Sequence, residues 1–316
     1  MKRRNVLGSA LCAALPVAAQ KRPRIAYIAE RGGPNEFEQN FLSGLRERGW
    51  NDGAQVNIDF RWSGGDAQRA RANAAELLAL SPDLVVTSDG ASLRTMRSLN
   101  AAVPIVHPAM GDAIASGYAS SLSNPDRNIT GITVLATELG PKRVELLKEA
   151  LPGLRKIGVI TNAVRPPQYG SDTRTAAATL GLDPLDMRLT LPDGVEAGIA
   201  AAARGGVQAL IVVSDTSTIT YRQPLCDAAL RHRMPTMFAN RTYMRAGGLM
   251  SYGPDLEASF HRAAYFVDRI LKGAKIADLP IEQPTTFQMV VNLKVSKALG
   301  VVFPRSTMLR TTEVIE

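Results

Sequence analysis

Cysteine and histidine are scarce in this sequence of 316 residues, which contains two cysteines and three histidines. Cys12 falls in an apolar N-terminal segment, so Cys226 alone remains for the folded domains and no disulfide can form within them. The histidines are not grouped with cysteines, which argues against a metal site. We therefore expect no metal, no cofactor and a core large enough to stabilise the fold unaided. Cys226 lies in a helical pattern and is expected to be a small buried residue rather than a reactive thiol.

Motifs of nucleotide and nucleophile chemistry are absent as well. The turn at residues 32–34 matches neither the dinucleotide fingerprint nor the phosphate-binding loop, and no G-x-S-x-G elbow occurs. The formal net charge is +8, but the basic residues form no long run, so no nucleic-acid partner is expected. The sequence therefore does not predict an enzyme, and function classes that bind a molecule without converting it remain.

The N-terminus has the pattern of a secretory signal. Basic residues at 2–4 precede an apolar run over 6–19 whose last residues are small, as at a signal-peptidase site. A membrane anchor is the alternative, but a spanning helix needs about 20 apolar residues and this run is shorter. We predict a signal peptide at 1–19, cleaved near Ala19, and a mature protein in the periplasm. The paired arginines fit either the general secretory or the twin-arginine route, and the leucine before Cys12 argues against lipidation.

Short β-rich runs alternate with helical patterns along the chain. The runs occupy residues 24–28, 56–61, 83–87, 104–107, 157–161, 209–213 and 236–239. This order predicts an α/β protein with parallel sheets covered by helices on both faces. Because the alternation restarts near residue 156, we expect two Rossmann-like lobes.

Strand-like segments connect the two sets of elements. They lie at residues 128–133, 249–253 and 284–292. Three crossings allow both lobes to pivot about one three-stranded hinge. The predicted domains are lobe one, residues 20–132 plus 253–283, and lobe two, residues 133–252 plus 284–316.

Several stretches together resemble a known family. They are residues 104–106, 111–112, 128–131, 143–148, 247–253, 270–275, 278–285 and 291–294. In this order they resemble the ABC transporter substrate-binding family that includes tryptophan/tyrosine-binding periplasmic receptors. The resemblance implies a type I periplasmic-binding fold, a small-molecule ligand between the lobes, and an ABC permease with its ATPase as partner. It also implies contact with the membrane only through that complex, and we expect a monomer.

Ligands of parallel α/β sheets bind at the carboxyl ends of the strands. Applied to the predicted strands and crossings, this rule selects small polar loops in both lobes. The candidate ligand-binding residues are Arg31, Gly90, Ala91, Ser92, His107, Met110, Asp112, Asn162, Asp215, Asn240 and Tyr252.

Two of these positions have a specific expected role. The turn from Gly90 to Ser92 opens a helix, where backbone N–H groups favour an anion. The alternative is an ordinary helix cap made by Ser88 or Asp89. Asp215 ends an all-apolar strand and is expected to meet a cation. The resemblance implies that an Asp at this position faces the ligand's ammonium, and the alternative is again a cap.

Other candidates keep two interpretations. His107 contacts ligand or is a packing residue, and relatives usually carry an apolar residue there. Asp112 contacts ligand or braces its loop, and Tyr252 forms an apolar wall or hinge core. The anion cradle and Asp215 point to a zwitterion such as an amino acid, while a nucleoside or another polar solute stays open. Few aromatic residues occur in these loops, which therefore give no sign of stacking on an aromatic ligand.

The resulting hypothesis is an extracytoplasmic solute-binding protein of an ABC importer. Its alternative is a periplasmic ligand-sensing module that docks to a signalling partner.

Overall fold

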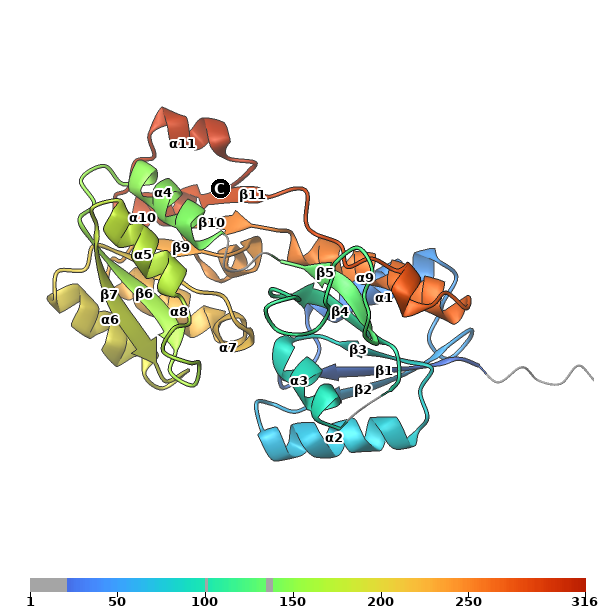
Figure 1. Cartoon of the computed structure of the whole chain (residues 1–316). Coiled ribbons are helices and arrows are strands. Elements are labelled where there is room, and N and C mark those ends of the chain that lie inside the picture. The colour runs from blue at the N-terminus through green and yellow to red at the C-terminus, as the bar shows by residue number, and fades with distance from the viewer. Residues whose placement is uncertain (1–21, 100–101, 135–138) are drawn as a thin grey trace, which may run out of the picture.

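The computed structural model describes residues 22–99, 102–134 and 139–316. Figure 1 shows two α/β lobes side by side. The predicted signal peptide, with Cys12 and the cleavage site near Ala19, lies outside the described residues. Within the described ranges, no helix is long and apolar enough to cross a membrane.

The first lobe is built on five parallel strands in the order β2-β1-β3-β4-β5. Its elements are β1 (Arg24–Ala29), α1 (Glu36–Glu47), β2 (Asn57–Trp62), α2 (Ala67–Ala79), β3 (Leu84–Thr87), α3 (Gly90–Ser98), β4 (Ile105–Met110), β5 (Ile129–Thr133), α9 (Leu256–Leu271) and η2 (Ile276–Asp278). Alternate residues of β1 serve opposite faces of the sheet. Ile25 and Tyr27 pack with α1 and α9, whereas Ala26 and Ile28 pack with α2 and α3.

The second lobe contains a seven-stranded sheet in the order β12-β11-β10-β9-β8-β6-β7. Its elements are α4 (Gly140–Ala150), β6 (Lys156–Asn162), α5 (Ser171–Thr179), β7 (Asp183–Leu189), α6 (Val195–Arg204), β8 (Ala209–Val212), α7 (Thr216–Thr220), α8 (Arg222–Arg231), β9 (Thr236–Phe238), η1 (Arg241–Ala246), β10 (Met250–Gly253), β11 (Gln288–Asn292), α10 (Leu293–Leu299), α11 (Arg305–Arg310) and β12 (Glu313–Ile315). The pairs from β7 to β10 are parallel, and β11 runs antiparallel to β10.

The chain passes between the sheets three times. It leaves the first sheet after β5, returns to the first lobe in α9 after β10, and enters the second sheet again at β11. The returning segment pairs with the first lobe through a bridge between Ile132 and Glu282. The predicted fold class, two Rossmann-like lobes joined by three crossing segments, is confirmed.

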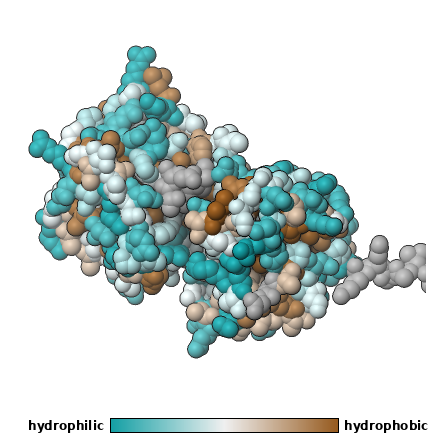
Figure 2. All heavy atoms as spheres, in the orientation of Figure 1, coloured by the Kyte–Doolittle hydropathy of each residue, from teal (hydrophilic) through white to brown (hydrophobic). Residues whose placement is uncertain are grey.

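The surface of the molecule is mostly polar on the face drawn in Figure 2, where apolar residues form small separate groups. Among the residues that the structure describes, the large exposed apolar side chains are few and scattered along the chain: Ile114, Val164, Leu185, Leu230, Val302, Leu309 and Val314. Scattered exposure of this kind needs no partner to explain it.

Cys226 is expected to be inert in the folded protein. Its side chain is buried in the second lobe, and its Sγ lies 3.7 Å from the carbonyl oxygen of Tyr243. Burial raises the pKa of Cys226 to about 12, so the reactive thiolate is almost absent near neutral pH. A chromogenic disulfide reagent should therefore label the thiol only after unfolding in guanidinium. Rapid stoichiometric labelling of the native protein would contradict this prediction.

Candidate functional site

A cavity of about 300 Å³ lies between the lobes. Both lobes line it, and it has the size and mixed polarity of a small-molecule site. The first lobe contributes Arg31, Asn35, Phe37, Ser88, Asp89, Gly90, Arg94, His107, Ala109, Gly111, Ser116, Tyr118, Pro254, Leu256 and Phe260, and Val134 lines the cavity from the crossing that follows β5. The second contributes Arg143, Arg165, Tyr169, Ser214, Asp215, Thr216, Ile219, Thr220, Ala239 and Asn240.

Ion pairs join the two lobes beside this cavity. Arg222 of α8 lies 3.1 Å from Glu36 of α1, and Arg245 lies 2.9 Å from Glu257 of α9. Ile219 of α7 packs against the cores of both lobes. The two lobes are therefore in direct contact in this structure.

Arg31 enters the cleft wall from the loop after β1. Its Nη1 donates to Ser88 Oγ over 2.7 Å, and its Nη2 forms an ion pair with Glu38. Glu38 also accepts the backbone N–H of Asn35 in the capping box of α1. The charge of Arg31 is thus balanced within the first lobe.

The turn at Gly90 is capped by the protein itself. Asp89 Oδ1 accepts the N–H of Ser92 over 2.9 Å, and Asp89 Oδ2 accepts the N–H of Glu30 over 2.7 Å. Gly90 lines the cavity, whereas Ala91 and Ser92 do not. The cap interpretation therefore describes this helix start, because a carboxylate already occupies the position that a bound anion would take.

Arg94 covers the same helix start. Its Nη1 would lie 3.3 Å from a Cβ placed on Gly90, so the side chain folds back over the first turn of α3 toward the cleft. Burial raises the pKa of Tyr169 to about 12, and the charges of Arg165, Arg143 and Arg94 oppose that rise. Since Tyr169 belongs to the other lobe, the guanidinium of Arg94 acts across the cleft.

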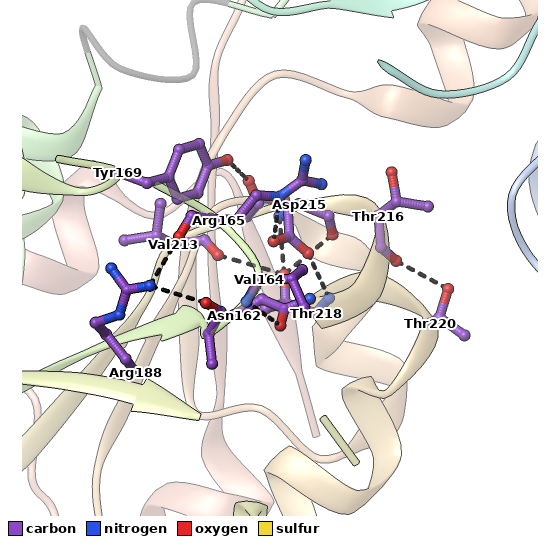
Figure 3. Close-up of polar contacts among 12 residues, drawn as sticks. Asn162, Val164, Arg165, Tyr169, Arg188, Val213, Asp215, Thr216, Thr218 and Thr220 are labelled. Carbon is purple, nitrogen blue, oxygen red and sulfur yellow. Dashed lines mark hydrogen bonds and ion pairs between the residues drawn. The ribbon is translucent and has the colours of Figure 1, made fainter. Parts of the chain in front are cut away.

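The second lobe presents a cluster around Asp215, drawn in Figure 3. Asp215 Oδ1 accepts the N–H of Thr218 in the capping box of α7, and Oδ2 accepts Arg165 Nε over 3.0 Å. The Tyr169 hydroxyl donates to the carbonyl of Ser214 over 2.6 Å. The Asp215 side chain is only 2% exposed, so it holds α7 and Arg165 in place.

Arg188 of β7 fixes the loop that carries Arg165. Arg188 Nη2 donates to the carbonyls of Ala163 and Arg165, each over 2.8 Å (Figure 3). The Arg165 guanidinium also lies 5.8 Å from the centre of the Tyr169 ring. Among the described residues, Nη1 and Nη2 of Arg165 have no hydrogen-bond partner. Arg165 therefore turns a pre-oriented pair of donors toward the cleft.

Arg143 of α4 lies where the crossing after β10 leaves the second lobe. Its side chain is buried, and its Nε donates to the Tyr252 carbonyl over 2.8 Å. Its Nη2 lies 3.5 Å from the Ala239 carbonyl oxygen. Burial lowers the pKa of Arg143 to about 10, which still leaves the guanidinium charged at neutral pH. It adds positive charge to the cavity wall and ties the crossing to α4.

Five of the eleven residues expected from the sequence line the cavity: Arg31, Gly90, His107, Asp215 and Asn240. The six others do not: Ala91, Ser92, Met110, Asp112, Asn162 and Tyr252. Three of these six make local contacts that account for them. Met110 is core, Asp112 accepts the N–H groups of Ile114 and Ala115, and Asn162 accepts that of Val164.

Aromatic residues do line the cavity, which corrects the impression given by the loops alone. They are Phe37, Tyr118, Tyr169 and Phe260. Phe37 and Phe260 stack on each other at 4.6 Å. The strand-end rule does not reach helices or distant parts of loops. Phe37 lies on α1, Phe260 lies on α9, and Tyr118 lies on a loop far from any predicted strand end. Tertiary packing brings them to the cleft.

Of the three arginines that the sequence analysis missed, two had a weak signal in the sequence. Arg165 lies three residues after Asn162 in the same loop, and Arg94 lies one helical turn after Gly90. Extending the strand-end rule by one turn of chain would have found both. Arg143 gave no such signal, because it lies on α4, away from the predicted strand ends. Within the described residues, no group of three or more His, Cys, Asp or Glu could hold a metal ion.

Comparisons with known proteins agree with this architecture. The family model described as ABC transporter substrate binding protein matches residues 24–315. A tyrosine-binding protein of Clostridioides difficile (strain R20291) is 22% identical over 283 residues, covering 89% of this chain and 81% of the relative.

Solved structures are similar over the same length. A domain from Streptococcus pneumoniae in complex with L-Trp gives a TM-score of 0.84 at 23% identity, covering 93% of this chain and 100% of that one. A ligand-free, open substrate-binding protein with adhesive properties from Clostridium difficile gives a TM-score of 0.67 at 21% identity, covering 93% of this chain and 99% of that one. The resemblance inferred from the sequence is thus confirmed.

Proposed function

Because the chain belongs to the ABC transporter substrate-binding protein family, we propose that it is the extracytoplasmic receptor of an ABC importer for a small carboxylate with an apolar body. The observation that carries the ligand class is the arginine-rich cavity between the lobes. Four arginines line it, Arg31, Arg94, Arg143 and Arg165, against two aspartates, Asp89 and Asp215.

The aspartates leave little acceptor capacity for a cationic ligand. Every carboxylate oxygen of Asp89 and Asp215 already accepts a hydrogen bond from the protein. Arg165 keeps two donors for the cleft, and no carboxylate of the described residues lies within ion-pair distance of Arg94. Donors of this kind favour a carboxylate, which guanidinium groups bind in a fork geometry.

The rest of the wall is suited to an apolar or aromatic body. Phe37, Leu256 and Phe260 form one side, and Ile219 and Tyr169 lie on the other lobe. The names of the relatives, a tyrosine-binding protein and a domain in complex with L-Trp, support a ligand that combines a carboxylate with an aromatic group.

The positions of Arg94 and Arg165 couple ligand binding to closure of the two lobes. Arg94 belongs to the first lobe and Arg165 to the second, so one anion contacts both only when the lobes meet. A ligand that makes these contacts in the closed form shifts the population toward it. We propose that the permease recognises this form. The proposal includes export to the periplasm and the lobe boundaries given above, 20–132 plus 253–283 and 133–252 plus 284–316.

A thermal-shift panel tests the ligand class. We expect 3-phenylpropanoate or L-phenylalanine to stabilise the mature protein, by about 2.7 kcal/mol at 100-fold excess over Kd. Phenethylamine, which has the same body without the carboxylate, should give no shift. Stabilisation by the amine alone, or by neutral sugars alone, would overturn the carboxylate assignment. The importer role requires ligand-dependent cross-linking to a permease in inner-membrane vesicles, and cross-linking to other membrane proteins only would contradict it.

A further inference from the structure

We propose that His107 selects the ligand by accepting a hydrogen bond at Nε2, so that the preferred carboxylate also carries an O–H or N–H donor. This inference rests on the proposed function of the cleft and narrows its substrate class. It assigns a specificity role to a polar side chain that the rest of the site leaves unexplained.

His107 lies where the central sheet of the first lobe meets the cavity. It belongs to β4, and the regular pairing of β4 with β5 shifts between His107 and Met110. Such bulges end a ladder and redirect side chains at binding sites. His107 is 1% exposed, yet it is one of the residues that line the cavity.

The hydrogen bonds of the ring define its tautomer. Nδ1 lies 2.5 Å from the carbonyl oxygen of Thr87 and 2.9 Å from the Thr87 hydroxyl. A carbonyl oxygen only accepts, so we assign the proton to Nδ1. In the opposite tautomer, a lone pair on Nδ1 would face a lone pair on the Thr87 carbonyl oxygen. Nε2 therefore carries a lone pair, and none of the described residues supplies a donor to it.

The surroundings keep this ring neutral. Burial lowers the pKa of His107 to about 4. The bond to Thr87 and the charge of Asp89 oppose this decrease, and the charge of Arg94 adds to it. Because the folded-state pKa lies well below neutrality, the ring stays uncharged near pH 7. A neutral acceptor beside Arg94 attracts the hydrogen of a hydroxyl or N–H group without adding charge to the site.

Matched ligand pairs test this role by titration calorimetry. The pairs are 3-(4-hydroxyphenyl)propanoate with 3-phenylpropanoate, 3-phenyllactate with 3-phenylpropanoate, and indole-3-propanoate with its 1-methyl derivative. We expect the donor-bearing member of at least one pair to bind about tenfold more tightly or better, because a buried acceptor rejects an analogue that leaves it unpaired. In the His107→Leu variant that preference should disappear, and in His261→Gln, which changes a histidine on α9, it should remain.

The outcomes separate this inference from the proposed function. If no carboxylate binds the wild type, the proposed function fails. If carboxylates bind with no donor preference, or the preference survives in His107→Leu, only the role of His107 fails.

A spectroscopic measurement does not depend on the leucine variant folding. Long-range ¹H–¹⁵N spectra of the wild type, assigned with His232→Gln and His261→Gln, should show His107 as the Nδ1–H tautomer from about pH 5 to about pH 8. The Nε2 resonance should move when a preferred ligand is added. An Nε2–H tautomer, or a ring that titrates within this range, would overturn the proposal.

Discussion

Replacing Arg165 by methionine is expected to weaken the binding of 3-phenylpropanoate about 100-fold. The guanidinium is already oriented by Asp215 through its Nε and by the Tyr169 ring. Little freedom is lost when its two outer nitrogens bind a carboxylate. Methionine keeps much of the apolar length of the side chain but has no donor. Titration calorimetry on the mature protein measures the change.

Two further arginine variants make this result specific. Arg165→Lys keeps the charge without the fork and should bind with intermediate affinity. Arg231→Met removes an exposed arginine that pairs with Glu196 outside the cavity, and it should leave the affinity unchanged. A loss of less than about threefold in Arg165→Met would show that the carboxylate is bound elsewhere, since even one charged hydrogen bond is worth more.

Asp215→Asn decides between the two interpretations of this carboxylate. Asparagine also caps helices well, so α7 should persist while the partner of Arg165 loses its charge. If Asp215 acts by holding Arg165, L-phenylalanine and 3-phenylpropanoate should lose affinity equally. If it meets the ligand's ammonium, as the resemblance implied, only L-phenylalanine should bind more weakly. The geometry favours the first outcome because both Asp215 oxygens already have protein donors.

The fold was predictable because strong periodicity marks most of its elements. Strands such as β8, which is buried along its whole length, appear in the sequence as short continuous apolar runs. Strand β7 was not predicted. It is an edge strand whose residues are mostly exposed, including Asp183 and Asp186, so no apolar pattern reveals it. Its pairing with β6 arises from tertiary contact.

The site was predictable only at strand ends. The rule that selected Asp215 depends on topology alone, so it found residues of the right loops without knowing which way each side chain points. Asp112 and Asn162 have the same polarity as Asp215, but they cap their own turns. Long side chains from neighbouring turns, such as Arg94, reach the cavity from positions that the rule does not consider. Side-chain length therefore matters as much as strand position.

Gly131→Ala is expected to destabilise the protein strongly, although it adds only one methyl group. Gly131 pairs with His107 across β4 and β5 and has a φ of +139°, a conformation that favours glycine. A Cβ there would lie 2.0 Å from the His107 carbonyl oxygen. Both strands are buried, so neither can move away from the added methyl group without losing packing contacts. We expect a loss of about 3 kcal/mol or more, which corresponds to a decrease in Tm of about 5 °C for a chain of this length.

Gly33→Ala is the matched control, because it adds the same methyl group where no atom lies within 4 Å and φ is not positive. Its Tm, followed by circular dichroism without ligand, should stay close to that of the wild type. The Gly131 carbonyl also accepts the N–H of Glu282 from the returning crossing, so the alanine variant should disturb the hinge as well as the pocket. If the Tm of Gly131→Ala equals that of Gly33→Ala, then β4 and β5 do not pack as closely at Gly131 as the structure shows. In that case the position of His107 at the cavity wall loses its main support.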